Sequence, residues 1–137
     1  MRHKVLKAVE IPKWGNYLRE QWKKHFASHL TTEEQKLIGM DGFLWYLCAS
    51  EEVECLEKEE AIAAFKEQSK HKCTIFYQFI DEAYLLNTAQ LLTVEELPYI
   101  RDHMYYGDLY VMDWEGQWTF IMTHESECGP YFLTTDK

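Results

Sequence analysis

The sequence predicts an α+β domain in which helices pack on a mainly antiparallel sheet of about four strands. An N-terminal segment carries large apolar residues at the 3.6-residue period of a helix. Later segments of strand length are rich in β-branched and aromatic residues, and the clearest of them forms a hairpin near the C-terminus. The chain has 137 residues without an internal repeat, which predicts a single globular domain over residues 1–137.

The first predicted element is a helix from about Pro12 to Leu30, since proline suits a first helical turn. At about 100° per residue, its large apolar side chains form one wide face, made of Trp14, Tyr17, Leu18, Trp22, Phe26 and Leu30. Charged side chains such as Arg19 and Lys23 lie on the opposite side. We expect Trp14, Leu18, Trp22 and Phe26 to be buried against the sheet.

The middle of the chain alternates between helix and strand signals. Thr31 and Glu34 form a capping box for a short second helix, which Gly39 ends. The continuous apolar run over residues 42–50, GFLWYLCAS, predicts a buried strand. A helix remains the alternative, because periodicity cannot separate the two for such a run. Strong helix formers then predict a helix over residues 57–69.

Residues 73–80, CTIFYQFI, are β-branched and aromatic and predict a strand. Residues 81–92 are ambiguous and favour a helix, or irregular structure with a helical turn. Thr93 and Glu96 form a second capping box for another short helix.

Residues 108–125 predict a hairpin. Asp113 opens a type I turn, and Gly116 supplies the left-handed residue that closes it. In the predicted register Tyr110 and Met112 share a face with Trp118 and Phe120. Leu109, Val111, Thr119 and Ile121 then share the other face. Residues 129–134 are a candidate for a further short strand.

The net charge is -9, and it is unevenly distributed. Residues 1–30 hold 7 Lys/Arg and 2 Asp/Glu, a net charge of +5, and the remainder holds 7 and 21, a net charge of -14. Such an acidic chain lacks the basic residues that displace counterions from phosphates, so no nucleic-acid partner is expected. The negative charge indicates either ordinary solvated faces or an acidic surface that recognises a basic protein.

The sequence also bears on the compartment. The N-terminal segment MRHKVLKAVEIPK has no apolar stretch of signal-peptide length. No segment approaches the roughly 18 apolar residues of a membrane helix. We therefore expect a cytoplasmic protein that does not bind membranes. The cysteines, Cys48, Cys55, Cys73 and Cys128, form no C-x-x-C pair, and we expect free thiols that are mostly buried.

Histidines supply the first candidate site. His25 and His29 fall on the apolar face of the first predicted helix, where the i,i+4 spacing stacks them one turn apart. Two metal ligands on a helix have this spacing, but the metalloprotease motif needs Glu after the first histidine, and here Phe26 follows. The alternatives are histidines hydrogen-bonded at the edge of the core, or the lining of a polar pocket.

The segment HESECGP, residues 124–130, supplies the second. By alternation His124 continues the face of Trp118 and Phe120, while Glu125 points to the opposite face. If the first helix packs on this aromatic face, His25, His29 and His124 converge, and Cys128 could join them. The alternative interpretation is a strand end followed by a turn.

The sequence has neither a nucleophile elbow nor a phosphate-binding glycine loop, so no catalytic residue, cofactor or metal is predicted. A pair of Cys128 and His124 is conceivable, but closeness in sequence is weak support for it. The favoured function is a non-enzymatic protein-binding module of immunity or regulatory type. The alternative is a small metal-binding protein or enzyme that uses the histidine cluster.

The segments WKKHFASHL, DGFLWYLCA, DLYVMDWEGQWTFIMTHE and CGPYF resemble a family of small bacterial proteins, found mainly in bacilli, described as a domain of unknown function. The likeness runs from about Pro12 to Phe132. It implies a stand-alone cytoplasmic bacterial protein and assigns no functional residue. Small acidic α+β proteins of this kind also resemble toxin-neutralising immunity proteins, by analogy rather than by motif.

Overall fold

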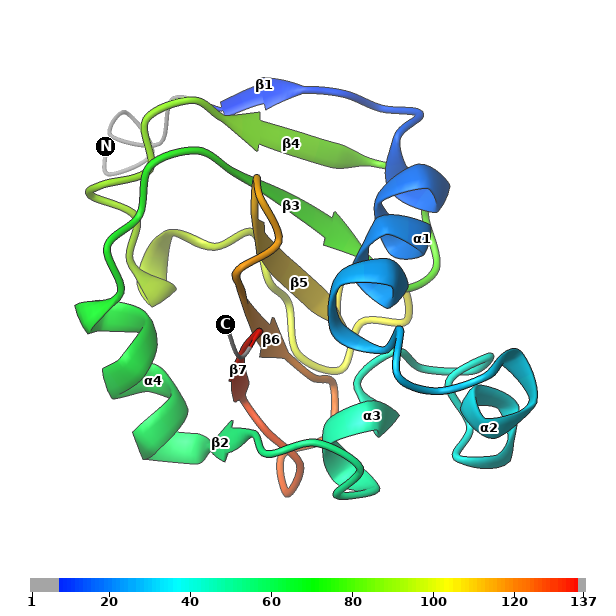
Figure 1. Cartoon of the computed structure of the whole chain (residues 1–137). Coiled ribbons are helices and arrows are strands. Elements are labelled where there is room, and N and C mark those ends of the chain that lie inside the picture. Colours follow the sequence, from blue (N-terminus) through cyan, green and yellow to red (C-terminus); the bar gives the residue numbers. More distant parts are fainter. Residues whose placement is uncertain (1–7, 136–137) are drawn as a thin grey trace.

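The computed structural model describes residues 8–135, which form one seven-stranded antiparallel sheet with helices on both faces (Figure 1). In chain order the elements are β1 (Ala8–Glu10), α1 (Gly15–Phe26), α2 (Thr32–Leu37), α3 (Tyr46–Ala49), β2 (Leu56–Glu57), α4 (Lys58–Glu67), β3 (Cys73–Tyr77), β4 (Ala83–Leu86), η2 (Val94–Glu96), β5 (Leu109–Asp113), β6 (Trp118–Met122) and β7 (Tyr131–Thr134). The strand order is β1-β4-β3-β5-β6-β7-β2. The α+β class is confirmed. The prediction of about four strands is wrong, because β1, β2 and β4 were not recognised.

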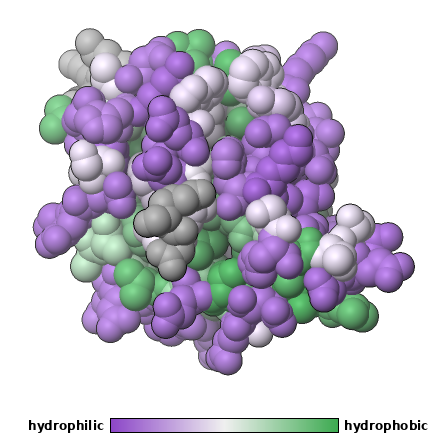
Figure 2. Space-filling model, in the orientation of Figure 1, coloured by the Kyte–Doolittle hydropathy of each residue, from purple (hydrophilic) through white to green (hydrophobic). Residues whose placement is uncertain are grey.

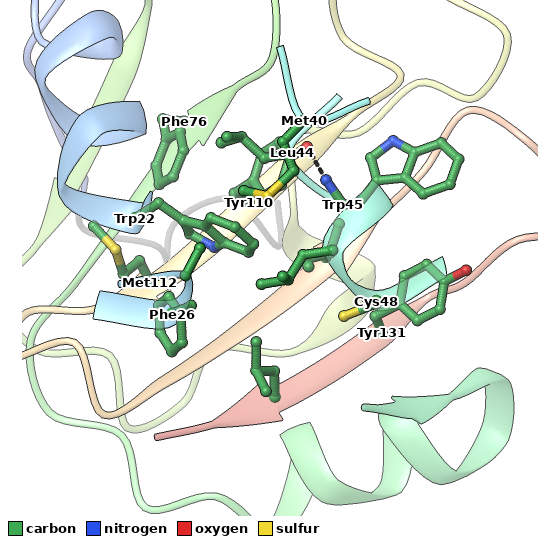
Figure 3. Close-up of a cluster of buried hydrophobic side chains, with 14 of the residues drawn as sticks. Trp22, Phe26, Met40, Leu44, Trp45, Cys48, Phe76, Tyr110, Met112 and Tyr131 are labelled. Atoms are coloured by element: carbon green, nitrogen blue, oxygen red, sulfur yellow. Dashed lines mark hydrogen bonds between the residues drawn. The ribbon is translucent and has the colours of Figure 1, made fainter. Parts of the chain in front are cut away.

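Each face of the sheet has its own hydrophobic core. On one face, α1 and residues 40–48 cover a cluster that includes Trp22, Trp45 and Tyr110 (Figure 3). On the other face, α4 covers a second cluster, in which the ring of Phe65 stacks on that of Phe120 with centroids 4.3 Å apart. The central strands are buried on both sides for this reason, and they read as continuous apolar runs.

The N-terminal helix is confirmed with shorter limits. Leu18, Trp22 and Phe26 are buried as expected, and the indole Nε1 of Trp22 donates a hydrogen bond to Thr119 Oγ1 at 3.0 Å. The expectation for Trp14 is wrong, since it precedes the helix and is 40% exposed. Arg19, predicted on the solvent side, instead donates hydrogen bonds from its guanidinium to the backbone oxygens of Tyr77, at the end of β3, and Ile80, in the loop that follows.

The run over residues 42–50 is not a strand. It forms turns followed by α3, so the helical alternative was closer. Leu44, Trp45 and Leu47 are all buried in the core that α1 also covers. The partly exposed positions, Phe43 and Tyr46, are also apolar, as is the exposed Ala49, so the periodicity that would reveal a helix is missing.

Residues 81–92 are also not helical. Ala83–Leu86 forms β4, which pairs with β1 on one side and β3 on the other. The tertiary pairing with β1 overrides a weak local preference.

The hairpin turn is confirmed, but its register is wrong by one residue. Gly116 has φ +73° and its N–H donates to Asp113 O, as a left-handed closing residue requires. The Asp113 carboxylate also accepts from Gln117 N–H, which holds Gln117 in the loop. Tyr110 therefore pairs with Ile121, and Val111 with Phe120. A one-residue shift exchanges the faces, so Trp118 and Phe120 lie on the α4 side of the sheet.

Local helix signals were only partly reliable. The capping box of Thr31 and Glu34 is present at the start of α2, and α4 occupies most of the predicted segment. The second predicted capping box is absent, because Thr93 makes no side-chain cap to the short 3-10 helix η2. The predicted C-terminal strand is β7.

The prediction that all four cysteines are free is wrong. Cys48 and Cys55 form a disulfide with a Cα–Cα distance of 5.7 Å, because the turn after α3 folds the chain back. Cys73 is a buried free thiol and Cys128 a partly buried one.

We expect Cys55→Ser to lower the free energy of unfolding by about 2.5 kcal/mol, the chain-entropy value for so short a loop. Urea denaturation of the oxidised protein and the variant measures this difference. The control is urea denaturation of the wild type in excess reductant, and its free energy of unfolding should match that of the variant. Equal stability of the oxidised and reduced wild type would contradict the prediction.

None of the helices within residues 8–135 has the length and apolar character needed to cross a membrane. Most of the N-terminal segment on which the expectation about a signal peptide rests, residues 1–7, lies outside the described residues.

Candidate functional site

The structure does not bring the three candidate histidines together. His25 is partly buried at the closed end of the β5–β6 hairpin, where a Cβ at Gly116 would lie 2.2 Å from its ring. α1 ends at Phe26, so His29 lies beyond the helix and is exposed. His124 follows β6 at the open end of the hairpin. The predicted convergence is therefore wrong, because the hairpin separates His25 from His124 along its length.

His124 is instead held by a buried carboxylate. Asp108, at the start of β5, is 2% exposed and accepts a hydrogen bond from the His124 backbone N–H at 3.1 Å. The His124 Nδ1 atom lies 3.0 Å from Asp108 Oδ1. Since an ionised carboxylate only accepts, Nδ1 carries the proton in this contact. The ring nitrogen Nε2 is left on the outer side, 3.5 Å from Glu125 Oε2.

Aromatic side chains complete the surroundings of this pair. The indole Nε1 of Trp45 donates to Asp108 Oδ1 at 2.9 Å. The ring of Phe43 lies 5.4 Å from the His124 ring, centroid to centroid. Gly107 lets the chain approach closely, since a Cβ there would lie 2.9 Å from His124 Cβ. The network fixes the imidazole against residues from two separated segments of the chain, 43–45 and 107–108.

Glu125 and Cys128 join His124, although alternation placed Glu125 on the opposite face. β6 ends at Met122, and the turn that follows brings the three side chains to one side. The Cys128 thiol donates to Glu125 Oε1 at 3.6 Å. Three of the five candidate residues, His124, Glu125 and Cys128, are therefore neighbours at this turn.

The chemistry of the turn is that of a thiol and not of a thiolate. Burial raises the pKa of Cys128, and the negative charge of Glu125 raises it further. Burial likewise raises the pKa of the adjacent Tyr131 to about 12. A thiol with a raised pKa is a poor nucleophile and a poor metal ligand. Residues 8–135 also contain no group of three or more His, Cys, Asp or Glu side chains arranged to hold a metal ion.

Sequence reasoning missed Asp108 and Trp45. The sequence pattern places Asp108 only at the start of the hairpin, and Trp45 within an apolar run that predicts a strand or a helix. The local signal for this position is an aspartate, Asp108, that follows a glycine and directly precedes an apolar strand. If such an aspartate is buried, its carboxylate needs hydrogen-bond donors nearby. The donors come from residues 63 and 16 positions away in the chain, which the sequence pattern does not connect.

Close to this turn lies a surface that we call the acidic edge, made of residues 51–60 and 125–127. Its exposed carboxylates are Glu51, Glu52, Glu54, Glu57, Glu59, Glu60, Glu125 and Glu127. The only basic residue in the two segments is Lys58, giving a formal charge of one minus eight, or -7. The two segments meet because Lys58 N–H donates to Pro130 O and Lys58 Nζ to Glu127 O.

The acidic edge includes an open strand. Among residues 8–135, β2 is the last strand of the sheet and pairs with Tyr131 and Phe132 alone. Next to it a groove of about 320 Å³ is lined by Glu54, Cys55, Leu56, Phe132 and Thr134. Hydrophobic surface is visible around α4 and α3 in Figure 2, with hydrophilic surface bordering it.

Comparison with known proteins gives a family but no activity. No curated protein and no solved structure matches the chain. A family model described as "Domain of unknown function (DUF4275)" matches residues 1–132. The match covers nearly the whole chain and confirms the resemblance to a domain of unknown function, so the chain belongs to the DUF4275 family.

Proposed function

We propose that this protein is a non-enzymatic protein-binding module of immunity or regulatory type, acting in the bacterial cytoplasm. The acidic edge binds a basic partner protein. The observation that carries this proposal is the concentration of a formal charge of -7 in two adjoining segments beside the open strand β2.

The partner that fits this surface offers basic side chains on an extended segment. Edge strands pair readily with a strand from another chain, because their backbone N–H and C=O groups are free on one side. Leu56, 42% exposed in β2, supplies apolar contact area in the middle of the carboxylates. Charge complementarity then speeds association and excludes acidic competitors.

The alternative, a metal-binding protein or enzyme, has less support. His25 and His29 lie apart from His124, so of these three histidines only His124, paired with Asp108, remains a candidate for acid–base chemistry. The neighbouring thiol of Cys128 has a raised pKa. A binding function needs no activated group and is the better supported of the two.

Two charge-matched variants test the proposal. Glu52→Lys, Glu54→Lys and Glu57→Lys together reverse the acidic edge, and Asp41→Lys, Glu67→Lys and Glu115→Lys together serve as the control. Each triple changes the net charge from -9 by six, to -3. We expect the wild type and the control to capture the same basic protein from bacterial lysate at low salt, and the acidic-edge variant to lose it.

Salt supplies the second criterion, because interactions between exposed charges weaken as the Debye length falls from about 10 Å at 0.1 M salt toward about 3 Å at 1 M. Hydrogen exchange on the purified complex should show protection at β2 and β7. Equal capture by the two triple variants, or protection confined to another surface, would contradict the proposal.

A further inference from the structure

A second site lies on the other face of the sheet, between α4 and the segment that precedes η2. The cavity there has a volume of about 510 Å³, within the range of small-molecule sites, which is roughly 300–1,000 Å³. Its two walls are fixed to each other, since Ala89 N–H donates to His71 O at 2.6 Å. It is separate from the acidic edge, with which it shares no lining residue.

The cavity has an apolar floor and an apolar rim. Phe65 and Leu92 are buried and belong to the core under α4. Ile62 and Leu91 line the same cavity but are 37% and 72% exposed. Large apolar side chains that line a cavity favour an apolar ligand, because binding removes their surface from water.

One buried cation faces this apolar surface. Lys70 lines the cavity and is 4% exposed. Its Nζ atom lies 4.4 Å from the centroid of the Phe65 ring and donates to the Gln68 backbone oxygen at a long 3.3 Å. Among residues 8–135 it forms no salt bridge with a carboxylate. An ammonium group has three donors, so the two contacts leave it incompletely satisfied.

A buried ammonium group without a carboxylate partner destabilises the folded protein unless an anion binds beside it. Charged groups are rarely buried without a partner, because removal from water costs more than weak contacts return. Burial also lowers the pKa of Lys70, which reports the same cost. An apolar side chain at position 70 would cover Phe65 equally well, so packing alone does not explain a lysine here.

We propose that this cavity binds a small amphiphilic monocarboxylate, whose carboxylate pairs with Lys70 and whose apolar chain lies along Ile62, Leu91 and Leu92. The charge of the lining favours a single negative charge, since Lys66 and Lys70 oppose Glu95 and leave a sum of +1. Glu95 disfavours polyanions, and the apolar walls disfavour small inorganic anions. This inference is independent of the protein-binding function.

The test uses octanoate as the probe and 1-octanol as its uncharged counterpart, with affinities measured by isothermal titration calorimetry on the full chain. The variant Lys70→Met removes the charge and keeps the length of the side chain. Lys24→Met, at an exposed position of α1, removes a charge elsewhere. We expect octanoate to bind the wild type and Lys24→Met alike, at least about tenfold more tightly than 1-octanol. In Lys70→Met this preference should disappear.

The melting temperature without ligand gives a separate readout. Lys70→Met should melt at a higher temperature than the wild type, because it removes an unpaired buried charge. A lower melting temperature would mean that the contacts with Phe65 and Gln68 account for Lys70, and it would overturn the inference. The inference would also be overturned if the wild type bound octanoate no more tightly than 1-octanol, or if Lys70→Met left the affinity for octanoate unchanged. If Lys70→Met does not fold, octanoate must shift the methyl resonances of Leu92 and Val94 in the wild type, and their failure to shift overturns the inference.

Discussion

Trp22→Ala is expected to lower the free energy of unfolding by about 3–5 kcal/mol, the usual cost of truncating a fully buried tryptophan. Trp22 has no exposed surface and packs against both Phe26 and Tyr110 (Figure 3). Its truncation opens a cavity between α1 and the sheet, and α1 has no disulfide to hold it in place. The lost indole hydrogen bond adds little, because Thr119 Oγ1 still donates to Val111 O.

The control for this prediction is Trp14→Ala. The same residue type lies just before the same helix, but it is 40% exposed and its ring contacts that of Tyr17, itself exposed. We expect it to cost less than about 1 kcal/mol. Urea denaturation at a fixed pH compares the two variants. Similar losses for both tryptophans, or a loss under about 1 kcal/mol for Trp22→Ala, would mean that α1 does not anchor the first core.

The amphipathic helices could be predicted because their pattern is local. The spacing of Leu18, Trp22 and Phe26 follows from one helix packed on one surface, so the buried face can be read from the sequence. The same reasoning failed at Trp14, because the periodicity was extended past the point where the helix begins. A helical wheel assigns a face but does not locate the first turn.

Elements whose neighbours are distant in sequence could not be predicted. β4 pairs with β3, which directly precedes it, but its other neighbour is β1, near the N-terminus. Trp45 lies in a segment whose partly exposed positions, such as Phe43 and Tyr46, are apolar too, so no polar side chains mark its solvent side. Local preferences are weakest where tertiary packing decides the structure.

In the candidate site too, the local grouping of residues could be predicted and the contacts between distant segments could not. The turn that gathers His124, Glu125 and Cys128 spans five residues of sequence, and the sequence did indicate a cluster there. The predicted convergence with His25 depended on the hairpin register and on which end of the hairpin each residue occupies. One additional loop residue, Gln117, moved the aromatic face away from α1. The partner that His124 does have, Asp108, lies across the hairpin and became visible only in three dimensions.

Removal of the Asp108 carboxylate is the second change with a large expected effect. Asp108→Ala should lower the free energy of unfolding by about 3–5 kcal/mol. The carboxylate accepts from Trp45 Nε1, from the His124 backbone N–H and from His124 Nδ1. Because Trp45 is 1% exposed, its indole N–H would be left without a partner and out of reach of water. Asp108→Asn should lower the free energy of unfolding less, by about 1–3 kcal/mol. Its amide oxygen can still accept from Trp45 Nε1, but its NH₂ group would face the donors of His124.

Glu125→Ala is the control, since Glu125 is exposed and its contact with His124 Nε2 spans 3.5 Å. We expect it to change stability by less than about 0.5 kcal/mol. The ¹⁵N chemical shifts of the His124 ring provide a second measurement. In the wild type and in Glu125→Ala the proton should remain on Nδ1, where Asp108 accepts it, and in Asp108→Asn this preference should be lost. If Asp108→Ala costs less than about 1 kcal/mol and the His124 tautomer does not change, the buried carboxylate neither supports this end of the sheet nor positions the imidazole. The open end of the hairpin would then be held by ring packing, including that of Trp45 on Tyr131, whose centroids lie 6.1 Å apart, and that of Phe43 on His124.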